Sequence, residues 1–175
     1  LVQCNFSQYS SRYDAFCAGD VQPAFDPACA GGALMDLGVY NVSYIVGLFG
    51  EPNQAKYTAN MERGIDTSGI LTMDYSGFKA VSIAAKDCAA PARYIIQGTK
   101  GYILQKSTAN CCGGITFHPN EGKEEHYNLN GGRPRQAAEF EAFARALESG
   151  DQELCGRMQD IWLILTSGRW EFCSA

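Results

Sequence analysis

The amino-acid sequence predicts an α+β fold, in which helices pack on one face of a large, open, mostly antiparallel β-sheet. Two patterns carry this prediction. Short segments in the middle of the chain alternate polar and apolar residues and are separated by turn residues. Three other segments place apolar residues at helical spacing. The resulting order is one strand, a long arm, a helix, many strands and then two helices, which is typical of helices gathered against one sheet.

The first third of the chain contains a strand, an arm and a helix. Residues 1–10 alternate apolar and polar side chains, which is strand periodicity. Residues 11–32, here called the arm, contain two prolines and three glycines and are predicted to be irregular. Loops of this length tend to be functional. Apolar residues then recur at helical spacing over 39–49, and Gly50-Glu51-Pro52 ends that helix.

Seven further strands are predicted in the middle of the chain. They cover residues 55–61, 69–75, 79–86, 92–98, 101–106, 114–118 and 124–129. The turns between them are short, so sequential neighbours are expected to pair antiparallel. One face is expected to bury Ile70, Thr72, Val81, Ile83, Tyr94, Ile96, Tyr102 and Leu104, while the other carries Leu71, Met73 and Ile95. A sheet that is apolar on both faces needs a second partner, and we expect a face-to-face homodimer.

Two helices are predicted near the C-terminus. The first covers residues 135–149 with Gly150 as its C-cap, and the second runs over 151–165 from Asp151 as its N-cap. Residues 1–175 are long enough for one domain. The chain begins without Met inside a predicted strand, so we expect it to be a fragment of a longer protein.

Composition excludes several classes of function. A net charge of −5 and a pI near 5.0 argue against binding to nucleic acid or to an anionic membrane. The apolar runs are too short for a membrane span, and no signal peptide is visible. An even count of eight cysteines is compatible with disulfides, but reduced thiols in the cytoplasm are favoured. No Cys-x₂₋₄-Cys spacing is present, so no metal site is expected.

The most informative segment is the run from Gly31 to Tyr40, Gly-Gly-Ala-Leu-Met-Asp-Leu-Gly-Val-Tyr. Its glycines permit close approach of another backbone or of a ligand. Asp36 and Tyr40 are four residues apart, so in a helix their side chains lie on one face. A carboxylate beside a phenol can bind a hydroxyl and exchange its proton. The alternative is structural: Asp36 caps the helix and Tyr40 packs.

This run resembles the C-terminal domain of the glucose–fructose oxidoreductase / inositol dehydrogenase (Gfo/Idh/MocA) family. Other segments agree with that family in the same order, over residues 1–165. They are Asp26-Pro27, Gly47-Leu48-Phe49-Gly50-Glu51-Pro52, Gly98-Thr99-Lys100-Gly101-Tyr102-Ile103, Glu139-Phe140-Glu141-Ala142-Phe143 and Leu147-Glu148-Ser149-Gly150-Asp151. The resemblance implies a fold like the C-terminal domain of glyceraldehyde-3-phosphate dehydrogenase, with a sheet that assembles homo-oligomers.

The resemblance also implies an activity, namely hydride transfer between NAD or NADP and a hydroxyl of a sugar, polyol or diol. Tyr40 stands where the family has its acid/base group, and Asp36 stands where it has the carboxylate partner. The family's N-terminal Rossmann domain is absent here, and the chain contains no Gly-x-Gly-x-x-Gly run, so no cofactor-binding residue is expected in it. The family's Lys-Pro motif is also missing. A phenol is a weak base without a neighbouring cation, so the chain alone is expected to fold but not to catalyse.

Three further residues are candidate contacts for a small carbohydrate-like substrate. Arg12 and Tyr13 follow the first strand and could reach substrate hydroxyls, although a surface pair between Arg12 and Asp14 is an alternative. Asn41 adjoins Tyr40 but points about 100° away on a helix, which makes it a weaker candidate. The rival to the enzymatic interpretation is a non-catalytic dimerisation or ligand-sensing module of the same fold.

Overall fold

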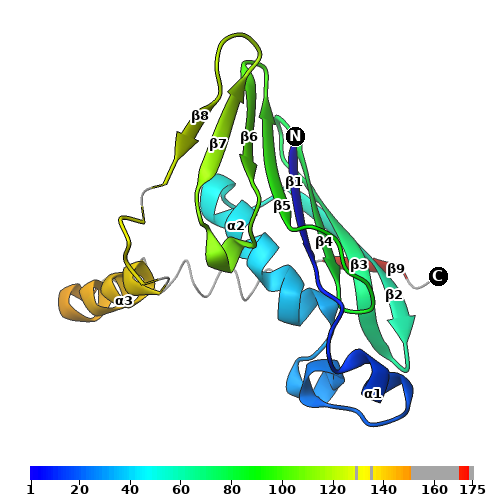
Figure 1. The fold of residues 1–175 in the computed structure, drawn as a ribbon. Coiled ribbons are helices and arrows are strands. Elements are labelled where there is room, and N and C mark those ends of the chain that lie inside the picture. The colour runs from blue at the N-terminus through cyan, green and yellow to red at the C-terminus, as the bar shows by residue number, and fades with distance from the viewer. Residues whose placement is uncertain (129, 135, 151–169, 174–175) are drawn as a thin grey trace.

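In the computed structural model, which describes residues 1–175 except 129, 135, 151–169 and 174–175, nine described strands form one sheet. Their order is β8-β7-β6-β5-β1-β4-β3-β2-β9, and helix α2 crosses one face (Figure 1). The strands are β1 (Val2–Ser7), β2 (Gln54–Glu62), β3 (Ile65–Asp74), β4 (Lys79–Ala85), β5 (Arg93–Gly98), β6 (Gly101–Gln105), β7 (Ile115–Pro119), β8 (Glu125–Tyr127) and β9 (Trp170–Cys173). Most pairs are antiparallel, so the predicted α+β class is confirmed.

The predicted elements lie close to the observed ones. The helices are α1 (Tyr13–Cys17), α2 (Val39–Phe49) and α3 (Ala137–Ser149), together with the short turns η1 (Pro23–Phe25), η2 (Pro27–Cys29), η3 (Leu34–Gly38) and η4 (Ala109–Cys111). Strand β3 begins four residues before its predicted start, and β9 was not predicted. The predicted helix over 151–165 lies outside the described residues.

The pairing of β1 corrects one expectation. This strand inserts between β4 and β5, parallel to β4 and antiparallel to β5. The prediction that sequential neighbours always pair antiparallel is therefore wrong for β4 and β5, which do not pair at all. The connection over 86–92 can reach roughly 20 Å, which exceeds the roughly 10 Å needed to cross one intervening strand. A short connection between two strands therefore does not by itself show that the strands pair as a hairpin.

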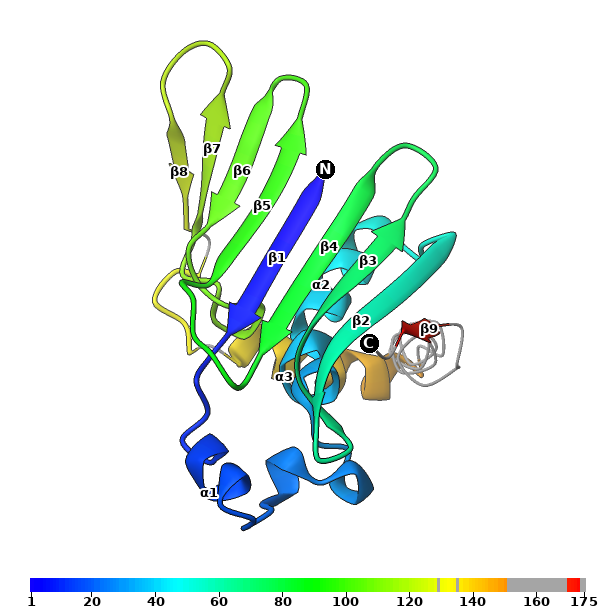
Figure 2. The same cartoon turned by 90° about the vertical axis from the view of Figure 1, so that its right-hand side faces the viewer.

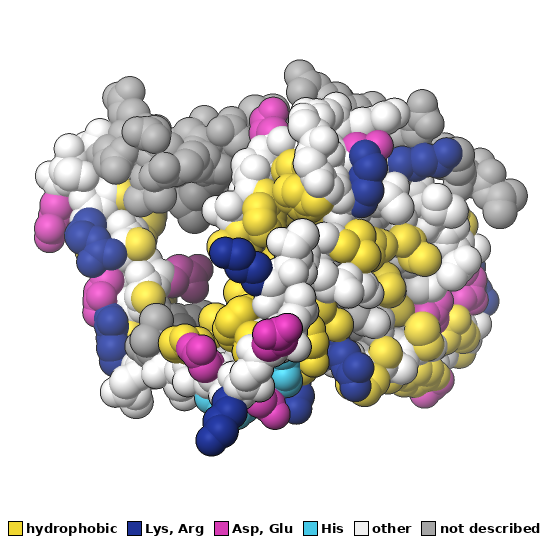
Figure 3. Space-filling model, turned by 90° about the horizontal axis from the view of Figure 1, so that it is seen from above, with side chains coloured by type: hydrophobic (Ala, Val, Ile, Leu, Met, Phe, Trp, Pro, Cys, Tyr) yellow, Lys and Arg dark blue, Asp and Glu magenta, His cyan; other side chains and the backbone are white. Residues whose placement is uncertain are grey.

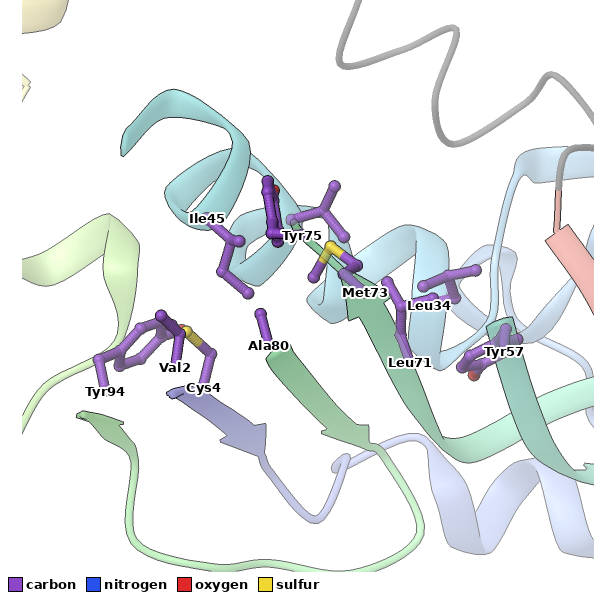
Figure 4. Packing of buried hydrophobic residues seen from close by; sticks show 11 residues of the cluster. Val2, Cys4, Leu34, Ile45, Tyr57, Leu71, Met73, Tyr75, Ala80 and Tyr94 are labelled. Atoms are coloured by element: carbon purple, nitrogen blue, oxygen red, sulfur yellow. The ribbon is translucent and has the colours of Figure 1, made fainter. Parts of the chain in front are cut away.

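The main hydrophobic core lies between α2 and the sheet (Figure 4). Val42 and Ile45 of α2 are fully buried there with Leu71 and Met73 of β3. The predicted faces of β3 are therefore wrong: Leu71 and Met73 face the helix, and Ile70 on the other face is 47% exposed. Apolar residues occupy both faces of this strand, so its alternation alone does not reveal which face the helix covers.

The opposite face of the sheet is open. No described helix covers the face turned toward the viewer in Figure 2. Strand register places Ile70 beside Ile83 and Ile95 beside Leu104 on this face. Seen from above the view of Figure 1, the molecule carries hydrophobic side chains interspersed with charged ones (Figure 3). We refer to Ile70, Val81, Ile83, Ile95 and Leu104 as the open apolar face.

Helix α3 ends at its predicted C-cap. Gly150 adopts a left-handed conformation with φ of 64° after α3, and its N–H donates to the carbonyl of Ala146, as the predicted C-cap requires.

The stretch Pro27–Phe49 is long and apolar enough to cross a membrane by length and composition alone. Its Leu34, Val42 and Ile45 are buried in the main core, which is also how a core helix packs.

Candidate active site

The arm folds into a small unit at the end of β1 (Figure 2). It was predicted to be irregular, but it contains α1 and the turns η1 and η2. Phe16 and Phe25 stack with ring centroids 4.7 Å apart and bury Ile65 at the start of β3. This second core is separate from the main one and fixes the arm against the β2–β3 hairpin.

The paired glycines serve the packing of the chain itself. A Cβ at Gly31 would lie 2.7 Å from the carbonyl oxygen of Pro23, and one at Gly32 would lie 2.0 Å from Oδ1 of Asp66. Gly32 also has a φ of 102°, which side chains rarely adopt. Of the two predicted partners for these glycines, a ligand or a protein group, the structure places protein groups against both.

Asp66 of β3 holds the start of the helix that carries the predicted catalytic pair. Its Oδ2 accepts hydrogen bonds from the backbone N–H of Leu34 at 2.7 Å and from the hydroxyl of Tyr57 at 2.6 Å. A carboxylate there satisfies a free N–H group and complements the positive end of the helix dipole. Burial nevertheless raises the pKa of Asp66 above its ordinary value, because these hydrogen bonds only partly offset the desolvation.

Asp36 lies in η3, a π-helical turn that precedes α2. Such turns occur frequently at functional sites. Its side chain is 46% exposed, and its Oδ2 is 2.7 Å from Nζ of Lys86. Lys86 follows β4 and is itself only 2% exposed. Its ammonium also donates to the carbonyl of Ala24 and lies 4.3 Å from the ring centroid of Phe25. Sequence reasoning did not find this cation.

A cavity of about 550 Å³ opens between the arm and η3. Residues 22–24 and 29–31 form its arm side, and Arg12 and Asp36 contribute the charged groups. Within the described part of the chain, the guanidinium of Arg12 has no hydrogen-bond or ion-pair partner. The alternative Arg12–Asp14 pair is not formed, and Asp14 instead accepts a hydrogen bond from Tyr9 at 2.6 Å. The cavity therefore offers a free cation and a carboxylate, groups that suit a ligand rich in hydroxyls.

Tyr40 lies one turn beyond Asp36 but does not border this cavity. Its side chain is 39% exposed, and its ring packs against Phe6 with centroids 5.8 Å apart. Among the described residues, its hydroxyl has no hydrogen-bond partner, and no hydrogen bond joins it to Asp36. Asp36 and Tyr40, the predicted acid/base pair, thus lie one turn apart in the same helical stretch. The Tyr40 hydroxyl and Oδ1 of Asp36 are both available to a ligand, and the catalytic role of the pair stays a prediction.

The remaining predicted contacts are occupied by protein groups. The hydroxyl of Tyr13 donates to Glu62 at 2.9 Å, a hydrogen bond that raises the pKa of this phenol, and its ring packs against Phe16 and Phe25. Tyr13 does not border the cavity. Its placement supports a structural role in the second core rather than the substrate contact that the sequence suggested.

Asn41 is fully buried on the sheet side of α2. Its amide N–H groups donate to the hydroxyl of Ser82 and to the carbonyl of Ile83, both at 3.0 Å, and its oxygen accepts from Tyr94. A substrate cannot reach this side chain without displacing core contacts. This placement supports a structural role for Asn41, whose amide joins α2 to β4 and β5, and a substrate contact at Asn41 stays an untested prediction.

The cysteines and histidines form no further centre in the described residues. Six cysteines are free thiols, namely Cys4, Cys17, Cys29, Cys88, Cys111 and Cys112, and burial raises the pKa of Cys4 to about 12. His118 and His126 lie on the neighbouring strands β7 and β8. Within the described part of the chain, no three His, Cys, Asp or Glu residues are grouped so that they could hold a metal ion.

Comparison with known proteins identifies relatives that are oxidoreductases. The NADP-dependent scyllo-inositol 2-dehydrogenase IolU of Bacillus subtilis is 33% identical over 150 residues, which cover 85% of this chain and 45% of that protein. An NADP-dependent D-xylose 1-dehydrogenase of Haloferax volcanii is 30% identical over 153 residues, covering 81% and 45%. The chain thus spans less than half the length of these curated relatives.

Solved structures share the fold. The 3-ketoreductase KijD10 of Actinomadura kijaniata, in complex with TDP-benzene and NADP, aligns with a TM-score of 0.66 over 98% of this chain and 52% of its own, at 17% identity. The model of the GFO/IDH/MocA C-terminal domain matches residues 1–104, a range that includes the arm, η3, α2 and Lys86. The chain belongs to the GFO/IDH/MocA family of oxidoreductases, as a C-terminal domain of that family.

Proposed function

We propose that this chain is the substrate-side half of an NAD(P)-dependent oxidoreductase that acts on a hydroxyl of a sugar, polyol or diol. The observation that carries the proposal is the Asp36 carboxylate on the wall of a cavity of about 550 Å³. Two relatives that match more than four-fifths of the chain are NADP-dependent dehydrogenases of an inositol and of xylose, which supports this substrate class and favours NADP.

The residues of this chain would orient the substrate and move one proton. The exposed oxygen of Asp36 accepts a hydrogen bond from a substrate hydroxyl, and the free guanidinium of Arg12 donates to another oxygen. Tyr40 exchanges a proton with the reacting oxygen: its hydroxyl donates the proton during reduction of a carbonyl, and its phenolate takes the proton of the alcohol during oxidation. The nicotinamide cofactor supplies the hydride chemistry.

This chain contains no Gly-x-Gly-x-x-Gly run, the loop sequence that binds a dinucleotide. We therefore assign its binding to a part of the protein outside this chain, and we expect the chain alone to lack activity. A homodimer through the open apolar face, a cytoplasmic location and the absence of nucleic-acid or membrane binding complete the proposal. The net charge of −5 supports the last two exclusions.

The test is turnover by the full-length protein. Absorbance of the reduced cofactor is followed with aldoses, inositols and vicinal diols, each with NAD and with NADP. We expect turnover with one of these classes, a large loss in Asp36→Asn, and retention in Asp14→Asn, a carboxylate on the arm outside the cavity. Cofactor binding without turnover would favour the ligand-sensing alternative. No binding of either cofactor would contradict the proposal.

A further inference from the structure

We propose that Lys86 is a positioning residue for the candidate active site, because it ties the Asp36 carboxylate to the arm and so fixes the two sides of the cavity relative to each other. The inference rests on the proposed function, in which Asp36 contacts the substrate. Lys86 does not border the cavity and would act only through Asp36 and the arm.

The Lys86 ammonium has three protein partners. One N–H points to Oδ2 of Asp36 at 2.7 Å and a second to the carbonyl oxygen of Ala24. The ammonium also lies 4.3 Å from the centroid of the Phe25 ring, within the range of a cation–π contact. With these three partners and a side chain that is almost fully buried, Lys86 is not open to a substrate.

These three partners come from opposite sides of the cavity. Ala24 and Phe25 belong to η1 in the arm, whereas Asp36 belongs to η3 at the start of the long helix. The backbone of Lys86 is fixed to the sheet region, since its N–H donates to Thr67 and its carbonyl accepts from Ser10, both at 2.8 Å. One buried side chain therefore connects sheet, arm and helix.

The contact with Lys86 fixes Asp36 and leaves part of its carboxylate accessible to a ligand. Among the described residues its Oδ1 has no hydrogen-bond partner, and the side chain is 46% exposed. A buried ammonium is costly unless it is paired, so the protein holds the two charges together closely. The pair of Lys79 with Asp74 lies at the other end of β4 and differs in this respect, because both side chains are largely exposed, at 64% and 45%. An exposed ion pair of this kind does not hold either side chain in a fixed position.

The test is a double-mutant cycle in the full-length protein with Lys86→Met, Asp36→Asn and the combined variant. We expect Lys86→Met to lower kcat/KM about 10²-fold, the order that a misplacement of about 1 Å costs. In the Asp36→Asn background the same change should cost less than about threefold. Lys79 at the start of β4 is also paired with an aspartate, and Lys79→Met should leave kcat/KM within about twofold of the wild type. Equal losses in the two backgrounds would overturn the proposal, because a merely structural lysine acts independently of Asp36.

A second measurement does not depend on activity. Hydrogen–deuterium exchange of the full-length Lys86→Met protein should show faster exchange over residues 22–31 and unchanged exchange over β2 and β3. Should Lys86→Met fail to fold, Lys86→Gln keeps a donor for the Ala24 carbonyl without the charge and takes its place in both experiments. Unchanged exchange in the arm would overturn the proposal. If the full-length protein turns over no substrate, the proposed function fails, while arm exchange still decides whether Lys86 holds the arm.

Discussion

Replacement of Asn41 by alanine tests whether this residue belongs to the core or to the substrate site. The substitution removes two amide donors and one acceptor, which bond to Ser82, Ile83 and Tyr94 in the interior. Each such hydrogen bond contributes roughly 1 kcal/mol net, so the loss is about 3 kcal/mol. For a domain of this size 1 kcal/mol lowers the Tm by roughly 2–4 °C, which gives an expected decrease of roughly 6–12 °C.

The assay is calorimetry of the full-length protein, combined with steady-state kinetics well below the transition. Asn53→Ala is the control, because among the described residues the side chain of Asn53 donates only to Ser76, at 2.9 Å on the surface. Its Tm should fall by less than roughly 2 °C. For Asn41→Ala we expect kcat/KM to change by less than about threefold at 25 °C. A Tm like that of the wild type together with a tenfold higher KM would refute the assignment of Asn41 to the core.

Three other predictions address the helix start, the thiols and the open face. Gly32→Ala should destabilise the protein by at least about 2 kcal/mol more than Gly64→Ala, because both positions have positive φ but only Gly32 faces the capping carboxylate. Equal Tm values would contradict this. At pH 8 iodoacetamide should modify Cys17 but not Cys4, whose pKa of about 12 leaves little thiolate; mass spectrometry after digestion decides, and equal rates would count against it. Ile83→Lys should convert a dimer to monomers in sedimentation, and a wild-type monomer at micromolar concentration would contradict dimerisation through the open apolar face.

Much of the fold could be predicted because local patterns were strong. The helix over 39–49 was predicted with its observed ends, since Gly50-Glu51-Pro52 stops it clearly. The seven strands of the middle segment were recognised from their alternation and turn residues. The pairing of strands distant in the sequence was harder to predict. The insertion of β1 between β4 and β5 is a long-range pairing that no local pattern encodes.

The candidate site shows the same limit. Asp36 and Tyr40 stand in a recognisable run of residues, so sequence reasoning found them. Lys86 was missed because its partner lies 50 residues away in the sequence. The sequence nevertheless contains a signal, because a lysine stands directly after the apolar strand β4. A cation buried at that position needs a carboxylate from another part of the chain. Adjacent residues of a helix point about 100° apart, and Asn41 is accordingly buried in the core while Tyr40 is partly exposed.

The most direct test of the account is the kcat of full-length Tyr40→Phe with the substrate identified in the turnover assay. Loss of a general acid/base should lower kcat about 10²–10⁴-fold while the Tm stays close to that of the wild type. Tyr44→Phe is the matched control, because Tyr44 lies one turn farther along α2 and packs edge-on against Tyr94 at 5.1 Å. It should keep kcat within about threefold of the wild type. A loss below about threefold in Tyr40→Phe would contradict the assignment of the acid/base role to Tyr40.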